Sequence, residues 1–382
     1  MAKSKNSTLN NILQWALFLG INILFVCKYA PRVDFNSIGS ACLFGLVTTG
    51  LFFLYRRFLH NRLTERLACI ASCILLAGIV VIIGLAIFFI EPLSIQVDRW
   101  SASTYFLDAL FQGIYPYGVH THISETNFIS PFPLWMYINL PFWFIGDVGW
   151  LQAFCLLLFA GAIYYYFRSW RAVLGILLLL CLSPAYWWEI ATRSDGLSNA
   201  LVVCSVILFM ERYPLLMKDK WWVLALIAGS VASTRLSAVV PLALYLFKPW
   251  IETDWKRKIG FIAIALLVVF GIFAPYIFWD TDTWIFLQYN PFITQTLQGS
   301  KILLLGMVCI AILIAYKKKT FYYYVSTTSV FLFVFMLASL LGVFWMRHIP
   351  ISFSNGLWDI SYFTLALPYV ALALVLSDET NS

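Results

Sequence analysis

The chain has 382 residues, of which 62% are hydrophobic and only 11% are charged. Soluble globular domains carry roughly a quarter charged residues, so this composition excludes an ordinary soluble protein. The net charge of +7 does not indicate nucleic-acid binding, because Lys and Arg lie in short clusters between apolar segments, as in membrane proteins. The eight cysteines fall inside apolar segments, without the spacing of a disulfide framework or a zinc site.

Apolar segments of about 20 residues, each long enough to cross a bilayer as a helix, follow one another along the chain. They predict an all-α, polytopic transmembrane helical bundle of about nine to twelve spans, some of them short or re-entrant. Lys3 and Lys5 precede the first segment, and no small-residue cleavage site follows it, which favours an uncleaved first span. The predicted spans are Ile12–Cys27, Ser37–Tyr55, Leu67–Ile90, Gly149–Phe167, Ala172–Ile190, Leu197–Met210, Trp221–Ala232, Ser237–Phe247, Ile259–Phe278, Ile302–Tyr316, Phe321–Val343 and Tyr362–Leu376.

Clusters of Lys and Arg predict which connections face the cytoplasm. Segment Pro131–Gly146 is apolar enough to be a span, but counting it as one would place every later cluster outside. We therefore interpret it as a re-entrant or interfacial helix, and the opposite orientation is the alternative. The cytoplasmic clusters are then Arg56–Arg66, Arg168 with Arg171, Lys218 with Lys220, Lys256–Lys258 and Lys317–Lys319. The outward segments are Glu91–Val148, Thr192–Gly196, Trp279–Lys301, Trp345–Ser361 and the hairpin tip Ser233–Arg235.

The first outer loop, Glu91–Val148, holds the leading candidate residue. Asp98 directly follows the third predicted span, and segment Ser101–Gln112 has apolar side chains at helical spacing, which predicts a helix along the membrane interface. A carboxylate fixed beside lipid is suited to act as a general base, because partial desolvation raises its pKa and its attraction for a hydroxyl proton. The alternative is that Asp98 only pairs with Arg99 or caps the following helix.

Two further polar groups are predicted to lie on the same side. Arg193 and Asp195 lie between two spans, where Asp195 would cap the next helix unless it has a functional role. Arg235 is a single charge in an apolar stretch, at the tip of a predicted hairpin of short helices. Its guanidinium fork suits a phosphate at headgroup level, and snorkelling to the interface is the alternative. The last outer segment adds Arg347, His348, Trp358, Asp359 and Tyr362.

The order of these residues resembles the GT-C glycosyltransferase superfamily, and within it the lumenal mannosyltransferases of the glycosylphosphatidylinositol pathway and their bacterial relatives. An acidic residue, Asp98, opens the first large outer loop, and the Asp-x-Asp form of the eukaryotic enzymes is absent because Arg99 and Trp100 follow it. The other matching residues are Gly113, Pro116 and Tyr117; Pro131 and Pro133; Ser183-Pro184 with Ala191–Gly196; Arg235 with Pro241; and Ser361-Tyr362-Phe363.

The resemblance implies an inverting glycosyltransferase that moves a mannose-like hexose or a pentose from a polyprenyl-phosphate donor to an extracytoplasmic acceptor. Asp98 would deprotonate the acceptor hydroxyl, and a second acidic residue would be Asp108 or Glu125. A divalent metal, Mg²⁺ or Mn²⁺, stays open, and His120 with His122 is only a weak two-ligand pattern. Residues expected to bind the donor phosphate or sugar are Arg99, Arg193, Asp195, Arg235, Arg347 and Tyr362, and those expected to stack on a sugar are Tyr115 and Tyr117.

The expected domains are an N-terminal transmembrane hairpin, 1–66, and a catalytic transmembrane domain, 67–382, that includes the outer loop 91–148. The expected partners are the polyprenyl-phosphate-linked sugar, a glycan, lipid or protein acceptor, and membrane lipids, with no nucleic acid. The expected location is a bacterial plasma (inner) membrane with an extracytoplasmic active site. A transporter or flippase of lipid-linked saccharides and a purely structural membrane subunit are the alternatives; the first would need polar residues near mid-membrane and often has repeated halves.

Overall fold

The computed structural model describes residues 2–59, 62–213, 217–296, 300–318, 320–346, 348 and 358–379. Within these ranges the regular elements are helices, and a single isolated β-bridge pairs His120 with Phe128. The predicted all-α class is therefore confirmed. The predicted site residue Arg347 lies outside the described residues, as does most of segment Trp345–Ser361.

Seven helices in the described ranges are long and apolar enough to cross a membrane, or up to eight spans if one bent helix pair counts as a single span. The chain is thus a multi-pass membrane protein. The number is below nine because four other predicted spans form helices of only 16 or 17 residues. The long spans are formed by α1 (Ala2–Tyr29), α2 (Ser37–Leu54), α3 (Glu65–Phe89), α6 (Trp150–Phe167), α12 (Trp255–Ile277), α16 (Phe321–Met346) and η5 (Ile360–Ala366) with α17 (Leu367–Glu379). The shorter helices are α9 (Gly196–Arg212), α10 (Met217–Ala232), α11 (Leu236–Ile251) and α15 (Lys301–Tyr316).

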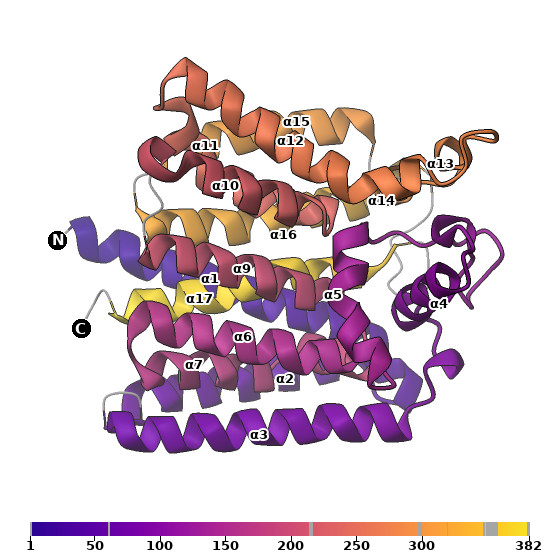
Figure 1. The fold of residues 1–382 in the computed structure, drawn as a ribbon. Coiled ribbons are helices and arrows are strands. Elements are labelled where there is room, and N and C mark those ends of the chain that lie inside the picture. Colours follow the sequence, from indigo (N-terminus) through magenta and orange to yellow (C-terminus); the bar gives the residue numbers. More distant parts are fainter. Residues whose placement is uncertain are drawn as a thin grey trace.

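The spanning helices run side by side, and the start of α1 lies at the same end of the bundle as the end of α17 (Figure 1). At the opposite end lie four shorter helices, α4 (Arg99–Phe111), α5 (Pro133–Phe144), α13 (Ile285–Gln288) and α14 (Pro291–Thr296) (Figure 1). The last span is almost wholly buried within the protein, whereas α2, α3 and α12 are mostly exposed, as expected for helices that face lipid.

Helix α5 corresponds to the predicted segment Pro131–Gly146. Its 12 residues extend about 18 Å, which is too short to cross a hydrocarbon layer of about 30 Å. Pro133 begins the helix, because the first turn does not need its missing N–H, and Gly146 ends the segment with a positive φ of 108°. The helix also lies crosswise to the bundle (Figure 1). Length and placement agree with a re-entrant or interfacial helix.

The predicted span Ala172–Ile190 is broken into α7 (Trp170–Cys181) and α8 (Pro184–Ala191), which are bent by 74° relative to each other. Pro184 cannot donate the backbone hydrogen bond that would continue α7, so a new helix begins there. The carboxamide of Asn22, from α1, accepts hydrogen bonds from Ser183 Oγ at 2.5 Å and from Ala185 N at 3.2 Å. A side chain of the first span therefore caps the helix that restarts after the break.

Helix α1 is packed into the main core rather than set apart in an N-terminal hairpin. Phe18, Ile21 and Phe25 are at most 1% exposed and belong to the same apolar cluster as residues of α9 and α17. Gln14 Nε2 also donates to Ser326 O of α16 at 3.1 Å. Helix α1 therefore contributes to the same core as the later helices, and the expected division at residue 66 stays a prediction.

Candidate functional site

Segments that are distant in the sequence meet at the end of the bundle that carries α4 and α5 (Figure 1). Tyr115, in the first outer loop, donates a hydrogen bond to Tyr289 O at 2.8 Å. Phe132 N donates to Thr234 O, at the tip of the α10–α11 hairpin, at 3.0 Å. The segments that were predicted to face one side of the membrane therefore come together, and the candidate residues lie among them.

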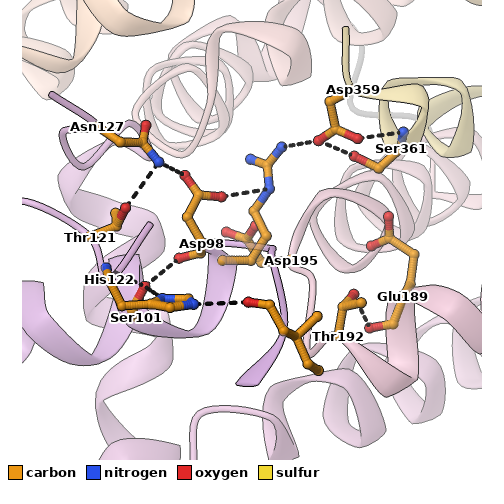
Figure 2. A network of polar contacts seen from close by, with 12 residues as sticks. Asp98, Ser101, Thr121, His122, Asn127, Glu189, Thr192, Asp195, Asp359 and Ser361 are labelled. Atoms are coloured by element: carbon orange, nitrogen blue, oxygen red, sulfur yellow. Dashed lines mark hydrogen bonds and ion pairs between the residues drawn. The ribbon is translucent and has the colours of Figure 1, made fainter. Parts of the chain in front are cut away.

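Asp98 lies at the N-cap position of α4, but its side chain makes no capping hydrogen bond. Its Oδ2 accepts a hydrogen bond from Asn127 Nδ2 at 2.8 Å, and the same nitrogen donates to Thr121 Oγ1 at 2.9 Å (Figure 2). Its Oδ1 lies 3.7 Å from Arg99 Nε, which is ion-pair distance but too long for a hydrogen bond. Because 28% of the side chain is exposed, this carboxylate is oriented by the protein yet retains one oxygen that can accept a proton.

Arg99 lies between two carboxylates. Its guanidinium donates to Asp359 Oδ2 at 2.9 Å, and Asp359 is fixed by the backbone N–H and the hydroxyl of Ser361, at 2.9 and 2.7 Å (Figure 2). The Tyr362 ring centroid lies 5.6 Å from the guanidinium carbon, within cation–π distance. Burial alone would lower the pKa of Arg99, but Tyr362, Asp98 and Asp359 raise it above its ordinary value. Arg99 is therefore a fixed cation beside Asp98.

Ser101 and His122 support the backbone at Asp98. Ser101 Oγ donates to Asp98 O at 3.0 Å and lies 2.7 Å from His122 Nδ1, while His122 Nε2 lies 2.9 Å from Ile95 O. The imidazole is thus occupied by contacts within the loop. Among the described residues no three His, Cys, Asp or Glu side chains form a group that could hold a metal ion, so the His120 and His122 pattern has no third ligand there.

A second ion pair is buried deeper at this end. Asp195 and Arg235 are each 5% exposed, and Asp195 Oδ2 accepts hydrogen bonds from the Arg235 guanidinium and, at 2.7 Å, from Trp135 Nε1. Burial alone would raise the pKa of the Asp195 carboxyl, but Arg235 and Arg99 lower it below its ordinary value. Asp195 makes no side-chain cap of α9, so the capping interpretation is wrong. Asp195 Oδ1 and Arg235 Nε have no hydrogen-bond partner within the described part of the chain.

The two ion pairs belong to one electrostatic network. The charge of Arg99 lowers the pKa of Asp195 in addition to attracting Asp98 and Asp359. The Asp98–Arg99 pair and the Asp195–Arg235 pair therefore influence each other electrostatically. Glu189 adds a further buried carboxylate at 2% exposure. Its Oε1 accepts from Thr364 Oγ1 at 3.1 Å, and its Oε2 accepts from Leu197 N, in the first turn of α9, at 3.2 Å.

Arg193 makes contacts within the protein, and the donor-binding role expected for it stays a prediction. Its NH2 group donates to the carbonyls of Ile87 and Ile90 at 2.7 and 2.9 Å, at the C-terminal end of α3, and its Nε lies 3.5 Å from Asp147. Gly149 leaves room for this side chain, since a Cβ at that position would lie 3.1 Å from Arg193 Cγ. The guanidinium donates to carbonyls that the end of α3 leaves unpaired, so Arg193 attaches this helix end to the segment before α9.

The remaining predicted residues lie outside this network. Tyr115 and Tyr117 are only 5% and 1% exposed and pack in a small aromatic core of the loop, so neither ring face is available to stack on a sugar. Asp108 Oδ1 accepts a hydrogen bond from Trp143 Nε1 at 2.9 Å and thereby joins α4 to α5. Glu125 is exposed in the loop. The role of a second acidic residue stays a prediction for both.

Three residues of the network were not selected from the sequence. Asp359 was noted only as one polar residue of the last outer segment, and no spacing links it to Arg99, 260 residues earlier. Asn127 and Glu189 are single polar residues whose partners lie elsewhere in the chain. Of these three residues, only Glu189 could have been selected from the sequence, because a carboxylate within an apolar segment must be paired or hydrogen-bonded.

Comparison with known proteins gave no matching protein-family model, and no curated protein or solved structure is significantly similar to this chain. The geometry of the Asp98 network therefore carries the functional argument.

Proposed function

We propose that this protein is a membrane glycosyltransferase that moves a sugar from a polyprenyl-phosphate donor to an acceptor hydroxyl. One observation carries the proposal. Asp98 is a partly exposed carboxylate with one oxygen held by Asn127 and the other beside, but not hydrogen-bonded to, the fixed cation Arg99. A positioned carboxylate with a free oxygen is what a general base requires.

In the proposed reaction, Asp98 Oδ1 accepts the proton of the acceptor hydroxyl as the hydroxyl oxygen attacks the anomeric carbon. The bond between that carbon and the phosphate oxygen breaks, and the electron pair leaves with the polyprenyl phosphate. A new glycosidic bond forms on the opposite face of the sugar, so the configuration is inverted. The proton then leaves Asp98 to solvent, through the 28% of its side chain that is exposed.

The cations of the network fit the charge that develops in this reaction. Negative charge grows on the departing phosphate, and fixed guanidinium groups stabilise it most where water is excluded. Arg99 is 9% exposed and Arg235 is 5% exposed, and each is held by a carboxylate in a defined orientation. Asp195 and Asp359 therefore act in this proposal as positioning residues for the two guanidinium groups.

The membrane setting supports a lipid-linked donor. Such a donor lies in the bilayer and reaches the end of the bundle laterally. The aspartates and Arg235 of the network precede the first residues of helices, namely Asp98 before α4, Asp195 before α9, Arg235 before α11 and Asp359 before η5. The proposed location is a plasma (inner) membrane with the network on the extracytoplasmic side, because the basic clusters of the other end would face the cytoplasm.

The test is an Asp98→Asn variant, assayed in membranes with a panel of labelled polyprenyl-phosphate hexoses and pentoses. The amide keeps the size of the side chain but cannot take a proton, so transfer is expected to fall about 100-fold or more. Expression, and binding of the lipid donor, are expected to stay near wild type. Asp282→Asn, at an exposed loop position, is the matched control and is expected to keep full activity.

Wild-type activity in Asp98→Asn would remove the proposed base and with it this mechanism. Movement of the labelled lipid across the bilayer without sugar transfer by the wild-type protein would instead favour the transporter alternative.

A further inference from the structure

Two basic side chains at the end of α1 are not used by the network described above. Lys28 lies in the last turn of α1, and Arg32 lies in the short 3₁₀ helix η1 (Ala30–Val33) that follows. They flank one aromatic ring. The Lys28 ammonium lies 5.9 Å from the Tyr29 ring centroid, and the Arg32 guanidinium carbon lies 4.7 Å from it. The result is a pair of cations around a tyrosine at the membrane end of a span.

Neither cation is neutralised by a direct contact. Within the described part of the chain, Lys28 and Arg32 take part in no hydrogen bond or ion pair, in contrast to Arg99, Arg193 and Arg235. Arg32 is exposed and Lys28 is half-buried. Their donor groups are therefore free to bind an anion.

The pair lies next to the candidate site. The Tyr29 ring packs 6.0 Å from the ring of Trp188, which directly precedes Glu189. Glu189 in turn accepts a hydrogen bond from Thr364 Oγ1 at 3.1 Å, and Thr364 lies five residues after Asp359, so the pair of cations packs against the same end of the bundle as the network.

The location of this pair is unusual for the chain. Other basic clusters lie at the opposite end of the bundle, where α2 ends at Arg56 and Arg57 and where Arg171 pairs with Glu65. Basic residues in membrane proteins concentrate on the cytoplasmic side, so a short connection with Lys28 and Arg32 at the other end runs against that preference. A binding role explains why positive charge is retained there.

We propose that Lys28 and Arg32 form the subsite that holds the phosphate of the lipid-linked donor beside the Asp98–Arg99–Asp359 network. The inference rests on the proposed function and goes beyond it, because it adds to Arg99 and Arg235, which are each paired with a carboxylate, two cations that would hold the phosphate when the donor first binds. Two cations at the end of a span lie at the depth of lipid headgroups, where a phosphate on a polyprenyl chain is held by the bilayer. The ligand class is a lipid phosphate monoester or diester.

The experiment measures binding of a polyprenyl phosphate to the full chain in nanodiscs of phosphatidylcholine, which carry no net charge. The variant Lys28→Gln/Arg32→Gln removes both charges, and its dissociation constant is expected to rise about tenfold or more. The matched control, Arg62→Gln/Lys256→Gln, removes one Arg and one Lys from exposed positions at the other end and is expected to bind as wild type does. Lys28→Arg/Arg32→Lys keeps both charges and is expected to bind within about threefold of wild type.

Unchanged affinity in Lys28→Gln/Arg32→Gln, or an equal loss in the control, would overturn the subsite. The charge-preserving variant separates loss of charge from disturbed folding. Because it keeps both cations, loss of binding in that variant would show that binding does not follow the charge and would also contradict the inference. Inorganic phosphate and the uncharged polyprenol are the comparison ligands. If inorganic phosphate competes as well as the lipid does, the site takes a free phosphate and the lipid assignment is wrong.

The outcome for the subsite is separable from that for the proposed function. Binding that depends on Lys28 and Arg32, in a protein that transfers no sugar from any polyprenyl-phosphate donor, would leave the subsite and remove the glycosyltransferase. Sugar transfer with a KM for the donor that is unaffected by Lys28→Gln/Arg32→Gln would leave the enzyme and remove the subsite.

Discussion

Arg99 and Asp359 are 260 residues apart in the sequence, and their side chains form a hydrogen-bonded ion pair of 2.9 Å. The pair joins the first turn of α4 to the start of the last span. Because Arg99 also lies 3.7 Å from Asp98, the environment of the candidate base depends on a carboxylate contributed by the far end of the chain.

Replacement of that carboxylate tests the dependence. Asp359→Asn removes the charge that fixes Arg99, so the guanidinium is expected to turn toward Asp98 and occupy its free oxygen. We expect a rate of sugar transfer about 10- to 100-fold below wild type, with donor binding changed much less, since small displacements of reacting groups have effects of this size. Single-turnover transfer and equilibrium donor binding measure the two quantities. Full activity in Asp359→Asn would show that Arg99 needs no such anchor.

Because Asp195 and Arg235 form a buried ion pair, we expect the effects of replacing them on the free energy of unfolding to depend strongly on each other. Removing one partner leaves the other charge buried without compensation, which costs about 3–5 kcal/mol. We expect Asp195→Asn and Arg235→Gln each to lower the unfolding temperature in detergent markedly. The loss of stability in the double variant is expected to be smaller than the sum of the two single losses. A double-mutant cycle by thermal unfolding measures this. Strictly additive losses would contradict a direct interaction between the two side chains.

A pH dependence follows from Asp359. Burial alone would raise the pKa of its carboxyl, but Arg99 and the hydrogen bonds from Ser361 lower it below its ordinary value. A group whose pKa is lowered by folding adds stability that is present above its unfolded pKa, about 3.9, and is lost as the pH falls through the folded value. Between about pH 5 and pH 3, the unfolding temperature of wild type is therefore expected to fall more steeply than that of Asp359→Asn. Parallel curves for the two proteins would refute this assignment.

Gly149, which directly precedes α6, and Gly161, within α6, form a matched comparison. A Cβ at Gly149 would lie 2.9 Å from Asp147 Oδ1 and 3.1 Å from Arg193 Cγ, whereas a Cβ at Gly161 meets nothing within 4 Å. We expect Gly149→Ala to destabilise the protein by about 1 kcal/mol or more through displacement of the Arg193 side chain. Gly161→Ala is expected to be neutral or stabilising, because alanine favours a helix by about 1 kcal/mol over glycine. Equal stability of both variants by thermal unfolding would mean that Arg193 has room to move.

Much of the fold could be predicted because membrane helices are determined by local composition. An apolar run of sufficient length must form a helix in lipid, and the predicted ranges accordingly fall on helices in the structure. The break at Pro184 was missed, because the whole stretch is apolar enough for one span and Asn22, which accepts a hydrogen bond from Ala185 N at the break, lies in a distant segment. The packing of α1 into the core could not be predicted either, since composition does not reveal which helices are neighbours.

The candidate site could be predicted only in part. Asp98, Arg99 and Arg235 are recognisable because charged residues at the ends of apolar segments are costly and therefore conspicuous. Their partners are not, because each lies in a different segment and the pairing is decided by how the helices pack. The roles expected for Tyr115 and Tyr117 failed because a loop aromatic residue looks the same in sequence whether its ring faces solvent or the loop's own core.

The long sequence separation of Arg99 and Asp359 has a consequence for biosynthesis. A ribosome releases residue 99 into the membrane long before residue 359 is made, so the candidate base has no complete surroundings until residue 359 has been synthesised. A polypeptide terminated ahead of the last span would still insert most of its helices but would leave Arg99 without its anchoring carboxylate. Under the proposed function, activity would then be acquired only after the segment with Asp359 has been made and packed against α4.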